Sequence, residues 1–203
     1  MSDSFIYING DNGIEEYLMM SFPTRRHEKL IGEYYGQFRN YFYGSGGCDI
    51  YGSNTGLFIG HRWDQISHLD SVIEEFKERI SEGRERTISI NPDFMVICGW
   101  VEEDFDYRGY HGIPKIIGEV WSPSTGIDDV TWKKDIYEAI GILEYWVISD
   151  ESNVSVFRLK DKKYERTDYH LKEGDSDTVL EIPCHLFDGL VIKIDKRIIS
   201  GRY

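Results

Sequence analysis

The feature that most restricts the fold of this chain is a carboxylate inside an apolar segment. Residues 115–125 read KIIGEVWSPST, whose isoleucines, valine and tryptophan are typical of a buried strand, and Glu119 stands in the middle of them. A buried carboxylate costs several kcal/mol unless it is paired, protonated or bound to a metal. The chain must therefore fold so that Glu119 reaches a partner for its charge.

A second acidic residue introduces the preceding apolar strand, which we predict over residues 93–100. Asp93 follows Pro92 and leads into FMVICGW, and Glu119 lies 26 residues further on. Two carboxylates on neighbouring strands are suitable ligands for Mg²⁺ or Mn²⁺, because hard cations prefer oxygen. The simpler alternatives are a turn role for Asp93 and a lysine partner for Glu119. The two carboxylates together indicate a metal site more strongly than either residue does alone.

A helix predicted over residues 128–140 offers further polar groups. Asp129, Lys133 and Tyr137 recur at every fourth position and share one stripe beside the apolar side of that helix. The lysine could bind a scissile phosphate or orient a water molecule. The alternative is an ordinary Asp–Lys helix pair, worth about 0.3–0.5 kcal/mol. Ser122, in the connecting SPST, could cap the helix or help to position a phosphate.

The rest of the chain alternates between helical and strand patterns. Thr24 is the predicted N-cap of a helix that stops at Gly44, and Arg25-Arg26-His27 at its start is either a phosphate contact or a solvated turn. A second helix is expected from residue 67 to about 82. Further strands are expected at 14–20, 49–51, 56–59, 113–121, 145–149, 154–159 and 164–169, with an edge strand at 190–194. This order predicts an α/β sandwich with a mixed sheet.

Composition narrows the class of protein. A net charge of −13 argues against a general nucleic-acid coat, whose affinity comes from neutralising phosphates. The longest apolar run, residues 94–101, is far shorter than the roughly 20 residues of a membrane span. Without a signal-peptide pattern at the start, the expected location is cytoplasmic, with no membrane partner. Cys48, Cys98 and Cys184 fit reduced thiols better than a disulfide framework or a zinc site.

The motifs together resemble a known family. They are Pro92-Asp93, the segment 119–125 (EVWSPST), Asp129, Lys133, Tyr137, Gly141 and the segment 144–146 (EYW). This set is similar to the putative restriction endonuclease family, formerly described as a domain of unknown function, of the PD-(D/E)XK nuclease superfamily. Glu16 and the following MMSFPTRRH, which ends in His27, are similar to the family's glutamate-bearing hairpin and helix-entry histidine. The resemblance covers most of residues 14–192.

The resemblance implies a fold and an activity. The expected fold is a restriction-endonuclease-like α/β (α+β) core, with a mixed central β-sheet flanked by helices and a C-terminal β-hairpin extension. It would form one domain over residues 1–203, with a helical insertion at about 65–83. The implied function is a Mg²⁺- or Mn²⁺-dependent nuclease that hydrolyses DNA phosphodiester bonds by a metal-activated water.

The resemblance also assigns roles to residues. Asp93 and Glu119 would hold the metal and act in catalysis with Lys133. Glu16 and His27 are secondary candidates. Ser122, Asp129 and Tyr137 would help to position these residues without reacting themselves.

One departure from the superfamily leaves alternatives open. Trp121 stands where the ExK motif places its lysine, so that role is carried to Lys133. This departure and the negative charge motivate a second hypothesis, a catalytically silent nuclease-fold protein that acts in nucleic-acid or protein binding. Hydrolysis of some other phosphoester is a third hypothesis. Assembly as a homodimer stays open, because related nucleases often pair.

Overall fold

The structure is a computed structural model. It describes residues 24–44, 46–59, 89–107, 109–121, 127–150, 152–171 and 178–200. Several expectations therefore lie outside the described residues: the strand at 14–20, the helix from 67 to about 82 and the insertion at 65–83. Glu16 and Ser122 lie outside them as well.

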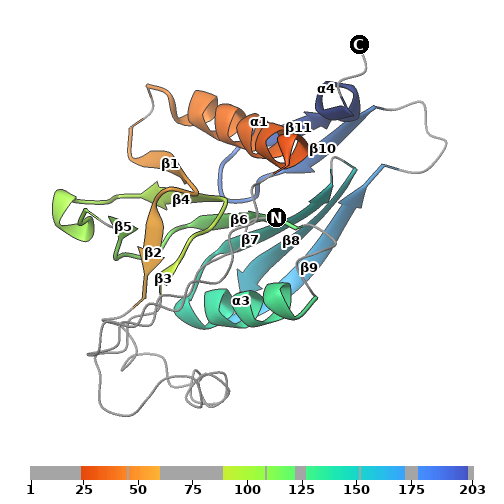
Figure 1. Ribbon diagram of the computed structural model, residues 1–203. Coiled ribbons are helices and arrows are strands. Elements are labelled where there is room, and N and C mark those ends of the chain that lie inside the picture. The colour runs from red at the N-terminus through yellow and green to blue at the C-terminus, as the bar shows by residue number, and fades with distance from the viewer. Residues whose placement is uncertain are drawn as a thin grey trace.

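A six-stranded mixed sheet forms the centre of the molecule (Figure 1). Its strands, in spatial order, are β1 (Cys48–Gly52), β4 (Phe94–Cys98), β6 (Ile116–Val120), β7 (Glu144–Asp150), β8 (Asn153–Lys160) and β9 (Lys163–His170). The pair β6–β7 is parallel, and the other four pairs are antiparallel. The parallel pair needs a crossover connection, and the helix α3 (Ile127–Ile140) supplies it. The predicted mixed sheet is confirmed.

Smaller elements surround this sheet. They are the three-stranded sheet of β3 (Ser89–Ile90), β2 (Gly56–Phe58) and β5 (Gly109–Tyr110), the hairpin of β10 (Val179–Pro183) and β11 (Val191–Asp195), the helices α1 (Arg25–Phe42) and α4 (Lys196–Ser200), and the 3₁₀ turn η2 (Glu102–Asp104). None of the helices in the described ranges is long and apolar enough to cross a membrane.

Helix α1 follows the sequence pattern closely. The hydroxyl of Thr24 accepts a hydrogen bond from the His27 amide at 3.2 Å and so caps the first turn. Every fourth residue from Leu30 to Phe42 is buried, which gives the helix one continuous apolar stripe. The helix ends at Phe42, just before Gly44 takes up a left-handed conformation (φ 78°).

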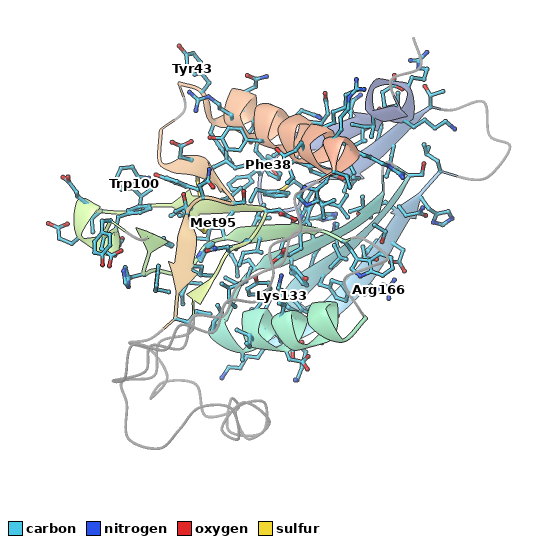
Figure 2. All side chains as sticks on the ribbon, in the orientation of Figure 1. Phe38, Tyr43, Met95, Trp100, Lys133 and Arg166 are labelled. Atoms are coloured by element: carbon cyan, nitrogen blue, oxygen red, sulfur yellow. A yellow bond between two sulfur atoms is a disulfide. The ribbon has the colours of Figure 1, made fainter. Side chains whose placement is uncertain are left out.

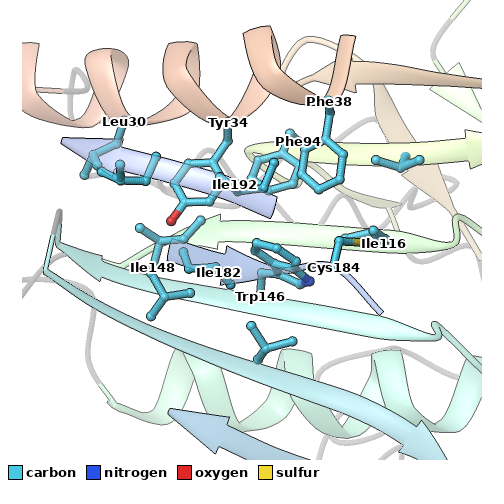
Figure 3. Packing of buried hydrophobic residues seen from close by; sticks show 14 of the residues in the cluster. Leu30, Tyr34, Phe38, Phe94, Ile116, Trp146, Ile148, Ile182, Cys184 and Ile192 are labelled. Carbon is cyan, nitrogen blue, oxygen red and sulfur yellow. The ribbon is translucent and has the colours of Figure 1, made fainter. Parts of the chain in front are cut away.

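Alternation along the strands divides the core into two layers. In β4, Phe94 and Val96 face α1, whereas Met95 and Ile97 face the opposite side, where α3 packs. Figure 3 shows the first layer, in which Tyr34 and Phe38 of α1 lie over Phe94 and Trp146. The ring centroids of these neighbours are 5.7–6.1 Å apart. Each face of the sheet is therefore covered by a different helix.

The predicted C-terminal β-hairpin extension is confirmed. The segment expected as an edge strand, residues 190–194, forms most of β11 and pairs with β10 in a two-stranded sheet of its own. Ile192 and Ile194 are fully buried in the α1 layer. The side chain of Gln37 in α1 accepts from the Lys193 amide at 2.8 Å and donates to the Lys193 carbonyl at 2.9 Å. The hairpin is therefore fastened to α1 through both backbone groups of one residue.

The expectation of three reduced thiols is wrong. Cys48 and Cys98 face each other across β1 and β4 and form a disulfide, whereas Cys184 is free and buried. Two cysteines 50 residues apart in sequence meet because their strands are neighbours in the sheet.

Candidate active site

The two predicted carboxylates lie opposite each other at the end of the β4–β6 pair. The register pairs Phe94 with Gly118 and Met95 with Ile117, so one further step places Asp93 opposite Glu119. Both side chains are buried, with 1% of Asp93 and 5% of Glu119 exposed. Gly118 permits this packing, because a Cβ there would meet the ring of Phe94 at 2.0 Å.

Helix α3 brings two polar groups to one oxygen of Glu119. The Tyr137 hydroxyl donates to Glu119 Oε1 at 3.0 Å, and Lys133 Nζ lies 3.1 Å from the same oxygen. Lys133 lies between α3 and the central sheet (Figure 2), and only 4% of it is exposed. The ammonium group thus reaches a carboxylate on a strand. Lys134, one position further along the helix, is partly exposed and instead contacts Asp135 at 2.6 Å.

Asp93 contacts one residue of β6 and one residue of α1. The Val120 amide donates to Asp93 Oδ2 at 2.6 Å, and His27 Nε2 of α1 lies 3.4 Å from the same oxygen. His27 is buried, whereas Arg25 and Arg26 beside it are exposed. Asp93 therefore stands between the first turn of α1 and the Glu119 strand.

Burial and charge change the proton affinities in this cluster. Burial raises the pKa of Glu119 from 4.5 to about 7; the negative charge of Asp93 adds to the rise, and Lys133 and Tyr137 oppose it. Burial and the charge of Glu119 hold the pKa of Tyr137 well above its ordinary range. Tyr137 is therefore a hydrogen-bond donor at any ordinary pH.

The donor set suits a hard divalent cation. Within the described ranges, no group of three or more His, Cys, Asp or Glu side chains has the arrangement of a metal site. Mg²⁺ commonly uses only one or two carboxylates and completes its shell with water and phosphate oxygens. The negative charge of Asp93 adds to the cost of ionising Glu119, and a bound cation would offset that cost. The pair fits Mg²⁺ or Mn²⁺ better than a closed zinc site.

The structure thus brings four of the predicted site residues together and leaves others undescribed. Asp93, Glu119, Lys133 and Tyr137 form one cluster, and His27 adjoins it. Asp129 lies within α3, but its side chain is outside the described part, as are Glu16 and Ser122.

A further buried carboxylate was not anticipated from the sequence. Glu144, 1% exposed, accepts from Trp146 Nε1 at 2.8 Å and from the His185 amide at 3.1 Å, and Arg158 Nε lies 3.5 Å away. Glu144 and Trp146 are two residues apart and lie on the same face of β7, the one turned away from α3. Because His185 follows β10, its hydrogen bond to Glu144 links the hairpin region to the central sheet. The alternation of EYWVI is the one signal that could have placed it there.

Comparison with known proteins supports the resemblance. Residues 11–187 match the sequence family Uma2, described as "Putative restriction endonuclease". Among solved structures, the fold is similar to that of a protein from Anabaena variabilis, described as a putative nuclease belonging to DUF820, with a TM-score of 0.59 and 15% identity over 90% of this chain and 85% of that one. No curated protein matches the sequence. Because the family match extends over most of its length, this chain belongs to the Uma2 family of putative restriction endonucleases.

Proposed function

We propose that the protein is a metal-dependent nuclease that hydrolyses DNA phosphodiester bonds at the Asp93–Glu119 pair. Family membership makes nuclease chemistry the first hypothesis. The observation that carries it is the buried contact of 3.1 Å between Lys133 Nζ and Glu119 Oε1. A buried lysine that meets a strand carboxylate beside a second carboxylate is costly as a purely structural device, since apolar residues could fill the same space.

The proposal gives each residue a task. Asp93 and Glu119 would hold Mg²⁺ or Mn²⁺ through oxygens that the Val120 amide and Tyr137 keep in place. A bound cation would polarise the phosphoryl oxygen and lower the pKa of the attacking water. Lys133 would orient that water or stabilise the negative charge that develops on the phosphate.

The position of Trp121 supports the transfer of the lysine role to the helix. The Trp121 amide donates to the Ile148 carbonyl at 2.8 Å, and its ring packs against the apolar layer that contains Ile136 and Tyr145. A tryptophan there leaves the strand without an ammonium group. Lys133 supplies one at the same carboxylate from the neighbouring helix.

Plasmid cleavage in Mg²⁺ or Mn²⁺ tests the proposal. We expect Asp93→Asn, Glu119→Gln and Lys133→Met each to lose at least about a hundredfold in rate, the range typical of lost electrostatic or acid–base groups. The matched control for Lys133→Met is Lys134→Met, whose partly exposed side chain contacts Asp135 instead of Glu119 and which should keep full activity.

The rival hypothesis is a silent nuclease-fold protein that binds nucleic acid or protein without cleavage. Equal rates in the parent and all three site variants would dismiss the assigned site. If the folded parent cleaves nothing with either metal but still binds DNA, the silent alternative holds.

A further inference from the structure

Outside the candidate active site, two sulfur atoms form a second group of reactive atoms. Cys48 is the first residue of β1 and Cys98 is the last residue of β4, and the register places them directly opposite each other. They are joined by a disulfide. The proposed hydrolysis of phosphodiesters makes no use of this bond.

The disulfide occupies a rung of the ladder that has no backbone hydrogen bond. At the next rung, the Gly99 amide donates to the Gly47 carbonyl at 2.7 Å. Hydrogen-bonded and non-hydrogen-bonded pairs alternate along antiparallel strands, so the cysteines form a non-hydrogen-bonded pair. Their Cα separation of 4.0 Å agrees with that type of pair. The sulfur–sulfur bond thus links the strands at a rung where the backbone does not, beside the Gly99–Gly47 hydrogen bond.

The surroundings leave room for an attacking thiolate. Both cysteines are half-buried rather than enclosed. Three flanking glycines have left-handed backbone angles, with φ of 66°, 90° and 65° at Gly46, Gly47 and Gly99. A Cβ built on any of them would meet no described atom within 4 Å other than those of its chain neighbours. The backbone beside both cysteines is therefore exposed and uncrowded.

The strand that the disulfide fastens is an outer one. In the part of the chain that the structure describes, β1 pairs only with β4 and forms the border of the central sheet. Ile50 is its one buried residue and packs beneath α1. At the far end, Gly52 pairs with Phe94, the neighbour of Asp93. Loss of the covalent link would leave β1 held by its ladder, by Ile50 and by the partly buried ring of Tyr51, which packs against Phe105.

We propose that Cys48 and Cys98 form a reversible thiol–disulfide site, reduced by a dithiol, and that reduction loosens strand β1. A thiolate of the dithiol attacks one sulfur, the bond between the cysteines breaks, and the other cysteine leaves as a thiolate that takes up a proton. The second thiol of the reductant then attacks the mixed disulfide and releases the first cysteine. Two electrons pass to the protein, and the reductant becomes a disulfide.

Cys184 provides an internal reference for this chemistry. It is 5% exposed, and its sulfur lies 3.8 Å from Glu144 Oε2. Burial raises the pKa of the Cys184 thiol to about 12, so little thiolate forms at neutral pH. A thiol reagent should therefore distinguish the paired cysteines from the buried one in the folded protein.

Thiol counting on the full chain, purified without reductant, tests the first half of the proposal. We expect no reactive thiol in the native protein, two after treatment with dithiothreitol, and the third only in denaturant. Cys184→Ser should leave the native counts unchanged, and Cys48→Ser should expose one reactive thiol at Cys98. Two reactive thiols before reduction, or a disulfide that resists dithiothreitol until the protein is denatured, would overturn the proposal.

Hydrogen exchange read by mass spectrometry tests the second half. After reduction, amides of β1 should exchange about tenfold faster, while those of β8, at the other side of the sheet, keep their rates. The double variant Cys48→Ser, Cys98→Ser should behave like the reduced protein. Unchanged exchange in β1, or an equal increase in β8, would contradict a local loosening.

Discussion

The buried carboxylate of Glu119 makes the stability of the metal-free protein depend on pH in an unusual direction. Its pKa is about 7 in the folded protein and 4.5 at its ordinary value. Between these values the folded state holds a proton that the unfolded state has lost. The contribution of Glu119 is therefore complete below pH 4.5, and it disappears as the pH rises through about 7.

The size of the effect follows from the same two values. A pKa difference of one between the folded and unfolded states corresponds to about 1.36 kcal/mol, so Glu119 contributes in full about 3 kcal/mol to the free energy of unfolding. Of this, about 2 kcal/mol falls between pH 5.5 and pH 8. This range also avoids the calculated isoelectric point near 4.9, where the protein would be least soluble.

Urea unfolding in the presence of a chelator, followed by tryptophan fluorescence at several pH values, measures the effect. The parent should lose about 2 kcal/mol relative to Glu119→Gln between pH 5.5 and 8, because the amide does not titrate. Glu165→Gln, at a largely exposed carboxylate of β9, is the control and should follow the parent. Lys133→Met should shift the loss to higher pH, since Lys133 lowers the Glu119 pKa. A constant difference between the parent and Glu119→Gln would refute the reasoning.

Three further predictions concern the same region. Tyr137→Phe removes the hydrogen bond to Glu119 Oε1 and should lower the free energy of unfolding by about 1–2 kcal/mol, measured by urea titration at pH 7. Gly118→Ala should cost about 1–3 kcal/mol in the same assay, because the new Cβ would overlap the Phe94 ring; an unchanged midpoint would contradict that packing. Mn²⁺ should raise the melting temperature more at pH 8 than at pH 6, since protons compete with the metal for Glu119, and the rise should vanish in Asp93→Asn.

Local patterns were enough to predict the parts of the fold that depend on neighbours in sequence. The cap at Thr24 and the four-residue spacing from Leu30 onward define α1 because both act within one or two helical turns. The same spacing places Lys133 and Tyr137 on one stripe of α3, where both contact Glu119. The alternation of β8 and β9 likewise predicts a hairpin.

Features that depend on which distant strands become neighbours could not be read in this way. Cys48 and Cys98 are paired by the register of β1 against β4, which no local pattern specifies. Besides Trp146 of its own strand, Glu144 is contacted by Arg158 of β8 and by the His185 amide in the segment after β10. The segment 190–194 has the alternation of an edge strand, but that local pattern does not specify its partner, which is β10.

The attachment of the C-terminal hairpin to α1 has a consequence for engineering this chain. Gln37 forms hydrogen bonds with both the amide and the carbonyl of Lys193. The first turn of the same helix places His27 beside Asp93. A truncation before β10 would remove Ile192 and Ile194 from the core layer beneath that helix and expose part of the layer to water. Tags, fusions and deletions at the end of the chain should therefore spare the hairpin, even though its residues are far in sequence from every proposed ligand.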